Sequence, residues 1–421
     1  MKKMMFITNR LPFPNTDGRK NLLQQYIQQV KDIYPECRIV NLSFVDDKKY
    51  LEHKPDAIAR LESLELPGML EKLFNALVYS LLMRKWPLQV SVYYSRRTHR
   101  RIKQLIEEEQ PEFIFYDMVR VAEYVADGTG QRVLSYDDLL SLRYERQLQW
   151  FRYIPSVFGG FSDKLPSGLK RFADLKFIQK WLIAFESKLL HKYEKHAARH
   201  FQHLIFTSPK EAETFRQIVS HRSCLGIPMR FDPDGQSAGN PRPYDRNKLV
   251  FVGKMDIPHN SSACVFFCEK IWPSIKRKAP DATFYIIGKN PTAEVLRLQQ
   301  TYPGVIVTGE VDDVKRVVSD AALMIAPLLF GTGIKTKIVE AMSWGVPVVT
   351  NPIGSEGINA INHEDLFVSE TDEEMVRNVL LLLNDKEMNE KVSRNSIRYV
   401  SRHFSSSVTR KNLELILSYS H

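Results

Sequence analysis

The residues best able to do chemistry in this sequence are concentrated in the segment 323–357. An apolar stretch that predicts a buried strand is followed by two glycines, Gly331 and Gly333, and then by Lys335, Lys337 and Glu340. Glycines let a backbone approach a ligand closely, and a helix after the loop points free N–H groups and the positive end of its dipole at the same space. With the lysine charges added, this pattern suits a diphosphate.

Glu340 suits a different group. A carboxylate one turn beyond Lys337 accepts hydrogen bonds from vicinal hydroxyls, as an acidic residue does for the ribose of a dinucleotide. A surface ion pair between Lys337 and Glu340, worth about a few tenths of a kcal/mol, is the alternative.

The elements that would position this loop alternate between strands and helices. In the C-terminal half we expect strands at 249–252, 283–287, 305–307, 323–327 and 346–350, separated by helices at 262–275, 293–300, 311–319 and 336–343. The N-terminal half shows the same alternation, with strands at 4–9, 38–44, 112–116, 132–136 and 204–207. Such alternation predicts parallel α/β sheets, whose ligands bind beyond the carboxyl ends of the strands.

The chain is long enough for two domains. At 421 residues it predicts an N-terminal acceptor-side domain over 1–225, an interdomain linker over 226–247 that is dense in turn-forming residues, and a C-terminal donor domain over 248–400. A last helix, 401–421, could pack back on the N-terminal domain.

Charge is unevenly distributed along the chain, whose formal net charge is +10. Between Glu71 and Glu107 there are eight Lys or Arg residues and no acidic residue. This asymmetry favours an anionic partner, such as a phosphate-bearing substrate, an anionic lipid surface or nucleic acid. A solvated basic face without a ligand is the alternative.

Cysteine and hydropathy patterns narrow the class of protein further. Four scattered cysteines do not form a disulfide framework and indicate a reducing cytoplasm, and Cys264 and Cys268 lack a second pair at zinc-ligand spacing. The apolar run at the N-terminus is too short for a signal peptide, and no apolar stretch of about 18 residues predicts a membrane span.

The segment 331–349 resembles the donor-binding signature of family 4 glycosyltransferases, which share the GT-B fold of two Rossmann-like parallel-sheet domains facing each other across a cleft. Segments 251–256, 271–273, 284–288 and 307–314 are similar to a branch often called exopolysaccharide sugar transferases. In the N-terminal half 11–14, 17–18 and 44–47 also resemble that branch.

The resemblance implies a role for each matching position. Glu340 would hold the donor ribose, the loop would lie against the nucleotide diphosphate, and Gly18 would belong to a loop of the other domain that closes on the donor. The residues that match the diphosphate-binding positions are Gly253, Lys254, Gly331, Thr332, Gly333 and Ile334.

Two positions depart from the family pattern. Many members carry a Glu eight residues before the ribose-binding one, where this chain has Thr332, so the transferred sugar stays open. Family members usually carry a second basic residue a few positions after the pair that Gly253 and Lys254 match. This chain has the stretch 258–260 there instead, and we expect Lys335 or Lys337 to substitute for the missing residue.

Family members retain anomeric configuration and need no tightly bound metal, so the resemblance implies no cofactor apart from the nucleotide-sugar co-substrate. Lys254 and Lys337 would then act catalytically by stabilising the departing diphosphate. Asp138, after the strand 132–136, could orient the acceptor hydroxyl, or it could cap a helix or a turn. The adjacent pairs 46–47, 137–138 and 312–313 are not interpreted as metal sites.

The resemblance thus implies a retaining hexosyltransferase that acts on a glycan or lipid-linked acceptor in surface or extracellular polysaccharide biosynthesis. We expect it in the cytoplasm or at the inner face of the membrane, because the basic stretches Arg84–Lys103 and Lys164–Lys195 carry aromatic residues that could lie on an anionic bilayer. Both stretches could equally be core-facing stripes with solvated lysines.

Three other interpretations remain open at this point. They are a nucleotide-sugar epimerase of the same fold, a non-catalytic partner subunit and a basic nucleic-acid-binding protein. No nucleic-acid motif accompanies the basic residues, so no nucleic acid is expected as a partner.

Overall fold

The computed structural model describes residues 1–15, 17–45, 48–126, 128, 130–154, 175–232 and 242–418. The chain divides into two compact units. Unit 1 comprises Met1–Ser141, Phe185–Arg230 and Ser406–His421, and unit 2 comprises Leu142–Ala184 and Phe231–Ser405. The segment 142–184 thus packs with unit 2, although we expected it in the N-terminal domain, and the last helix packs with unit 1. Part of the expected linker, 233–241, lies outside the described residues.

Unit 1 is built on a parallel sheet of seven strands in the order β3-β2-β1-β4-β5-β6-β7. The strands are β1 (Lys3–Thr8), β2 (Arg38–Phe44), β3 (Arg60–Leu64), β4 (Phe113–Asp117), β5 (Gln131–Asp137), β6 (His203–Phe206) and β7 (Cys224–Gly226). In the central strand β1, Met4 to Thr8 are all buried, which is the pattern of a strand covered on both faces.

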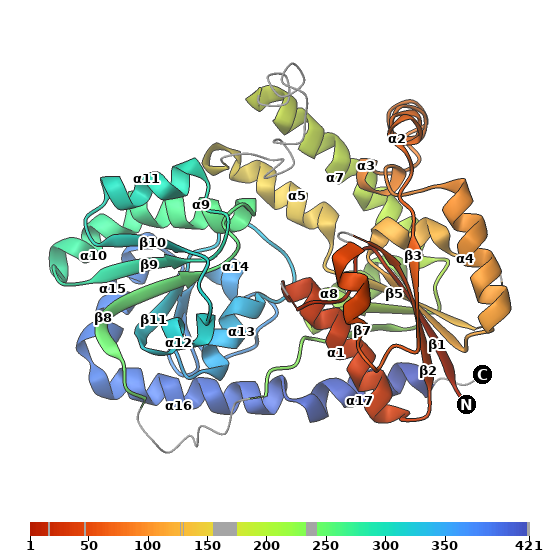
Figure 1. Ribbon diagram of the computed structural model, residues 1–421. Helices are drawn as coiled ribbons and strands as arrows, with labels where there is room; N and C mark the ends of the chain where they lie inside the picture. The colour runs from red at the N-terminus through yellow and green to blue at the C-terminus, as the bar shows by residue number, and fades with distance from the viewer. Residues whose placement is uncertain are drawn as a thin grey trace. The chain divides into compact units, whose positions relative to one another are not determined.

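The helical elements of unit 1 follow its strands in the usual alternation (Figure 1). They are α1 (Gly18–Ile33), η1 (Lys48–His53), α2 (Met69–Asn75), η2 (Ala76–Leu82), α3 (Leu88–Ser91), α4 (Arg96–Glu109), η3 (Val119–Tyr124), α8 (Pro209–Val219) and α17 (Ser406–Leu417). Two helices, α5 (Leu140–Gln149) and α7 (Lys176–Ala198), contain the boundaries between the units, and η4 (Phe151–Tyr153) belongs to unit 2.

Unit 2 contains a second parallel sheet, of six strands in the order β10-β9-β8-β11-β12-β13. The strands are β8 (Asp245–Val252), β9 (Thr283–Ile287), β10 (Val305–Gly309), β11 (Ala321–Ala326), β12 (Val348–Thr350) and β13 (Phe367–Val368). The helical elements are α9 (Pro258–Phe266), η6 (Phe267–Ile271), α10 (Trp272–Lys278), α11 (Ala293–Thr301), α12 (Val314–Ser319), α13 (Thr336–Ser343), α14 (Pro352–Ser355), α15 (Asp372–Asn384) and α16 (Lys386–His403).

Two large apolar clusters cover the sheet of unit 2, one on each face. Leu249 and Phe251 of β8 point into one cluster, with α9, α10, α11 and α15, whereas Val250 points into the other, with α12, α13 and α16. This alternation follows from the two-residue period of a strand. Helix α13 is therefore anchored by its apolar side chains, which leaves its polar face to line a site.

Both units are Rossmann-like parallel α/β domains, so the predicted fold class is confirmed. Among the described residues, no helix has the length and hydropathy needed to cross a bilayer. Likewise, no group of three or more His, Cys, Asp or Glu side chains in the described part of the chain could hold a metal ion.

Candidate functional site

The predicted loop lies at the point where the connections of the second sheet change direction. From β8 the chain moves to β9 and β10, and it then returns to the opposite side of β8 to form β11. Because β8 and β11 are parallel neighbours, their carboxyl ends, at Val252 and Ala326, lie at the same edge. Ligands of open α/β sheets bind at such a switch point. Gly253 and the loop before α13 both begin there.

The shape of this loop depends on its glycines and on one lysine. Gly331 has φ +147° and Gly333 has φ +66°, conformations that L side chains rarely adopt. The Lys335 ammonium turns back and donates to the carbonyl oxygens of Thr332 at 3.1 Å and Gly333 at 2.7 Å. Only 9% of Lys335 is exposed. Its main role in this structure is thus to hold the loop, although we expected it to face the ligand.

Lys337, in the first turn of α13, is the lysine that faces the end of β8. Its ammonium donates to Oδ1 of Asn260 and lies 4.4 Å from the ring centroid of Phe251. Burial, with a smaller contribution from the nearby charge of Lys335, lowers the pKa of Lys337 to about 7. A cation with a weakened hold on its proton is stabilised when an anion arrives.

The contact between Lys337 and Asn260 requires a glycine at position 253. A Cβ atom at Gly253 would lie 2.7 Å from the side-chain amide of Asn260 and 2.9 Å from the Lys337 ammonium. Any side chain there would displace both groups, so the glycine keeps the Lys337–Asn260 pair at the strand end.

Asn260 was not predicted as a site residue. Its amide nitrogen donates to the carbonyl oxygen of Lys254 at 2.9 Å, while its oxygen accepts from Lys337. Lys254 itself has a side chain that is 43% exposed and pairs with Asp256 at 3.3 Å. Asn260 therefore fixes the turn after β8, with the Lys254 ammonium more exposed and the Lys337 ammonium less exposed. The sequence signal that could have identified Asn260 was the absence of the family's second basic residue from the stretch 258–260.

Glu340 lies one turn further along α13 and is partly exposed. Burial raises the pKa of its carboxyl group to about 7, and no hydrogen bond or ion pair of this carboxylate is recorded with any described residue. The alternative of a Lys337–Glu340 ion pair is thus absent from this part of the chain. A largely desolvated carboxylate without a partner is costly, which makes it a candidate for ligand binding.

Two arginines of α5 brace the loop within unit 2, and neither was predicted. Arg143 donates from Nε to the Thr332 hydroxyl at 3.3 Å. Arg146 donates to the carbonyl oxygen of Gly331 at 2.7 Å and forms a forked pair with Glu356, in which Nη2 and Oε1 are 2.8 Å apart. The forked geometry holds the arginine in place, so the loop is braced from a rigid helix.

The electrostatic effect of these cations is visible at His259, the residue before Asn260. Burial, and then the charges of Lys337, Arg143 and Lys335, hold the pKa of His259 well below its usual range. The ring is therefore neutral at pH 7. Several positive groups at one edge of a sheet create a potential that suits a multiply charged anion.

In unit 1, Gly18 begins α1, and the preceding Asp17 caps that helix by accepting from the backbone nitrogen of Lys20 at 3.0 Å. The next residue, Arg19, is buried and pairs with Asp117, with Nε and Oδ1 2.9 Å apart, and with Asp137 at 3.3 Å. This ion-pair cluster was not predicted. It fixes the first turn of α1 against the ends of β4 and β5.

Asp138 follows β5 and is only 2% exposed. It lies close enough to Glu194 to contribute to that residue's pKa, which burial, above all, raises to about 7. Glu194 accepts from the backbone nitrogen of Ser141 at 3.1 Å. Asp138 is thus part of a buried polar cluster in unit 1 and offers little surface to an acceptor in this structure. The predicted pair 46–47 lies outside the described residues.

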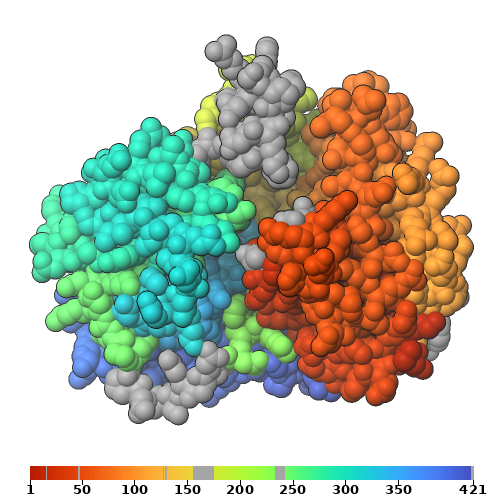
Figure 2. Space-filling model, in the orientation of Figure 1, coloured from red at the N-terminus to blue at the C-terminus, as the bar shows by residue number. Residues whose placement is uncertain are grey.

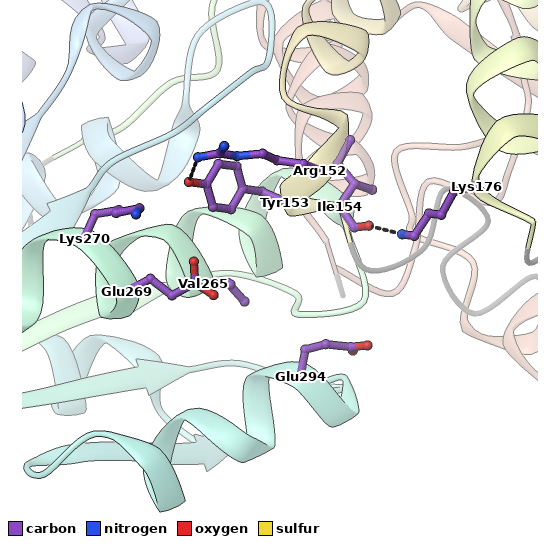
Figure 3. A pocket seen from close by; sticks show the side chains of 8 residues that line it. All are labelled: Arg152, Tyr153, Ile154, Lys176, Val265, Glu269, Lys270 and Glu294. Atoms are coloured by element: carbon purple, nitrogen blue, oxygen red, sulfur yellow. Dashed lines mark hydrogen bonds between the residues drawn. The ribbon is translucent and has the colours of Figure 1, made fainter.

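A separate cavity of about 600 Å³ lies in unit 2 (Figure 3). In it, Arg152 donates to the Tyr153 hydroxyl, and the Lys176 ammonium donates to the carbonyl oxygen of Ile154 at 2.7 Å. The other lining residues are Val265, Glu269, Lys270 and Glu294. No predicted site residue is among them, and the mixture of charges indicates no ligand class.

Comparison with known proteins finds similarity in sequence and in fold. Residues 246–385 match the family described as "Glycosyl transferases group 1", and the match includes Lys254, Lys337 and Glu340. An uncharacterized 44.6 kDa protein in the cps region of Klebsiella pneumoniae is 24% identical over 390 residues, which are 89% of this chain and 88% of that protein.

Solved structures are similar over the whole chain. HepE from Anabaena, in complex with UDP and glucose, has a TM-score of 0.65 at 15% identity, with 100% of both chains covered. A variant of TarM from S. aureus, in complex with Fondaparinux, alpha-GlcNAc-glycerol and UDP, has a TM-score of 0.66 at 10% identity, again with 100% of both chains covered. The fold is thus the GT-B fold, and together these matches support a glycosyltransferase of that type.

Proposed function

We propose that the chain is a retaining glycosyltransferase that moves a hexose from a nucleoside diphosphate sugar to a glycan or lipid-linked acceptor in polysaccharide biosynthesis. The observation that carries this proposal is the pair of groups on α13. Lys337 is a partly buried cation at the glycine-rich sheet edge, and Glu340 is a carboxylate without a recorded partner among the described residues, one turn away.

The spacing of the two groups suits the two parts of a nucleotide. Residues three apart on a helix lie on one face, about 5–6 Å apart at Cβ. Lys337, with the backbone of the loop at Gly331 and Gly333, can bind a diphosphate, while Glu340 can accept from the ribose hydroxyls. An anion at Lys337 and hydroxyl donors at Glu340 would each offset the desolvation that now perturbs these groups.

The same cations would act in the chemical step. When the bond between the anomeric carbon and the diphosphate breaks, negative charge grows on the diphosphate, and the acceptor oxygen takes its place on the carbon. The acceptor proton leaves with the departing phosphate oxygen. Lys337 and Lys254 would stabilise that charge, and preorganised positive groups are the largest single source of rate enhancement in many enzymes. We propose that these side chains, without a resident cofactor, neutralise the leaving group.

The relatives suggest the first donor and acceptor classes to test. The structures of HepE and TarM contain UDP, and the Klebsiella relative is encoded in a cps region. We therefore propose uridine as the first base to examine, and a polysaccharide precursor, in the cytoplasm or at the inner face of the membrane, as the acceptor.

A thermal-shift panel tests the donor half of this proposal. UDP, GDP, ADP and their hexose conjugates would be added to the full chain, and a diphosphate present at 100 times its Kd should stabilise the fold by about 2.7 kcal/mol. A rise in melting temperature with one base, abolished by Lys337→Ala, supports the proposal. If no diphosphate raises the melting temperature, the donor site is wrong.

A second experiment tests the reaction class. Incubating the preferred donor with lipid-linked and soluble glycan acceptors should give sugar transfer that depends on the acceptor. Interconversion of the donor sugar in the absence of any acceptor would contradict glycosyl transfer and favour an epimerase.

A further inference from the structure

The segment formed by α2 and η2 in unit 1 has its polar and apolar faces reversed. Two polar residues are buried against the protein: Asn75 is 4% exposed and Ser80 is 0% exposed. Asn75 donates to the carbonyl oxygens of Ser91 at 3.0 Å and Tyr94 at 2.8 Å, which ties α2 to the segment before α4. A helix packed on a core normally shows the opposite arrangement.

The apolar side chains of this segment point into solvent. The most exposed are Leu70 at 84%, Leu82 at 72% and Met69 at 71%. The remaining members are Leu73 at 60%, Met83 at 59%, Phe74 at 57%, Leu77 at 53% and Leu81 at 40%. We call these eight residues the apolar ridge. Figure 1 shows α2 projecting from unit 1 beyond its sheet, and Figure 2 shows the segment, in orange, as a raised part of the surface of that unit.

A continuous apolar surface of this kind indicates a binding surface. Soluble monomers rarely expose contiguous apolar patches larger than roughly a few hundred Å², and larger patches mark contacts with proteins or membranes. The ridge is made by consecutive turns of one helical segment, so it is also continuous along the chain.

Positive charge surrounds the ridge. The exposed residues Arg84, Lys85 and Arg96 follow it, Lys72 lies within it, and no ion pair of these four is recorded with any described residue. Arg96 contacts the hydroxyl of Tyr79, a residue of η2, at 3.4 Å. A cavity of about 410 Å³ beside η2 is lined by Tyr79, Lys85 and Arg96 among others, so cations also gather behind the ridge.

We propose that the apolar ridge inserts into the interface of an anionic membrane, with the surrounding lysines and arginines binding its phosphate headgroups. An apolar helical face bordered by Lys and Arg is the surface that anionic lipid attracts by two additive forces, burial of apolar area and charge. This inference rests on the proposed function, in which the acceptor is found at a membrane, and it adds the surface and its lipid preference.

The basic stretches by themselves would place the membrane contact at Arg84–Lys103 or at Lys164–Lys195. Of the two basic stretches predicted to lie on a membrane, Arg84–Lys103 borders the ridge, whereas in Lys164–Lys195 the residues 164–174 lie outside the described part of the chain. The apolar component of the proposed contact comes from residues before Arg84, which the sequence analysis did not select.

Vesicle flotation with the full chain, in the absence of any donor, tests the proposal. Wild type should bind vesicles of mixed phosphatidylglycerol and phosphatidylcholine at least tenfold more tightly than vesicles of phosphatidylcholine alone, and less tightly as salt is added. The triple variant Leu70→Gln/Leu73→Gln/Leu77→Gln should lose at least tenfold in affinity. The double variant Arg84→Glu/Lys85→Glu should lose the preference for the anionic lipid.

A matched control replaces three exposed apolar residues of unit 2, in the variant Leu296→Gln/Ile361→Gln/Leu381→Gln, and should bind vesicles as wild type does. Unchanged vesicle binding by the ridge variant overturns the proposal. The proposal is also overturned if wild type does not bind vesicles and instead self-associates through the ridge, as measured by sedimentation.

The two proposals fail separately. The thermal shift with UDP is measured on the same variants, and the ridge variant should keep it, which also shows that the variant is folded. Vesicle binding without a rise in melting temperature on adding UDP would support the membrane contact and refute the donor site. A rise in melting temperature without vesicle binding would support the donor site and refute the membrane contact.

Discussion

Replacing Glu340 by glutamine should make the ligand-free protein more stable and the donor complex weaker. In the substitution Glu340→Gln the side chain keeps its shape and loses its charge. Burial is the cause that raises the pKa of this carboxyl group from 4.5 to about 7, so the folded state carries a desolvation penalty whenever the group is ionised. The variant never carries that penalty.

The size and pH dependence of the gain follow from the two pKa values. Each tenfold change in acidity corresponds to about 1.4 kcal/mol, which gives an upper limit of about 3.5 kcal/mol, and partial exposure of the group reduces our expectation to about 1–2 kcal/mol. Because the folded-state pKa is the higher one, the penalty is absent below pH 4.5, grows between pH 4.5 and 7, and is complete above pH 7. The variant should therefore be more stable at pH 8 and equal to wild type at pH 4.

The effect on ligand binding should have the opposite sign. A hydrogen bond to a charged group is worth about 1.5–3 kcal/mol, so losing the charge should raise the Kd for UDP about 10- to 100-fold. The test compares UDP with 2′-deoxy-UDP by calorimetry. Wild type should prefer UDP, and Glu340→Gln should bind the two almost equally, as a double-mutant cycle requires for a direct contact.

Glu356 provides the matched control. It is a partly exposed carboxylate of the same unit that already has a forked partner in Arg146, so Glu356→Gln should lower the free energy of unfolding. Denaturant unfolding at pH 8 measures both variants. The reasoning about Glu340 would be refuted if its variant were destabilised like the control, or if it kept the preference for UDP.

Three further predictions concern the cations and the glycine at the strand end. Lys337→Ala should raise the Kd for UDP at least tenfold. The pKa of Lys337 is about 7 and only its protonated form attracts the diphosphate, so the UDP affinity of wild type should fall as pH rises from 7 to 9. The variant should show no such fall in calorimetry. Gly253→Ala should weaken UDP binding with little loss of stability, since the added Cβ meets the Lys337 ammonium at 2.9 Å; equal affinity would show that this contact can relax. Arg146→Ala should cost about 1–3 kcal/mol in unfolding experiments, because it removes the forked ion pair to the partly buried Glu356 carboxylate, whereas Arg216→Ala, which breaks an exposed pair, should leave the free energy of unfolding almost unchanged.

The sequence predicted long, apolar strands well and short, edge strands poorly. The strand predicted at 38–44 coincides with β2, which is buried over most of its length. By contrast, β3 lies at the edge of its sheet, is largely half-exposed and lacks a clear apolar pattern, and β7 has only three residues. Such strands are defined by pairing with a neighbour, which a local pattern does not contain.

At the site, residue types were predictable and partners were not. The glycines, Lys337 and Glu340 follow one another within ten residues, so their spacing on a loop and a helix could be deduced. Asn260 contacts Lys337 across 77 positions and Arg146 contacts Gly331 across 185 positions, and no periodicity connects such residues. The contacts of Lys335 are local, to the carbonyl oxygens of Thr332 and Gly333, but they depend on the backbone conformation of the loop, which residue spacing does not give.

Neither compact unit is a continuous stretch of chain, and this limits how the protein can be dissected. The polypeptide passes from one unit to the other four times, at 141/142, 184/185, 230/231 and 405/406. Two of these junctions fall inside the helices α5 and α7, so no single truncation releases either unit intact. Chimaeras that exchange donor-binding units between homologues would need to transplant both 142–184 and 231–405, since the first segment supplies the arginines that brace the glycine loop.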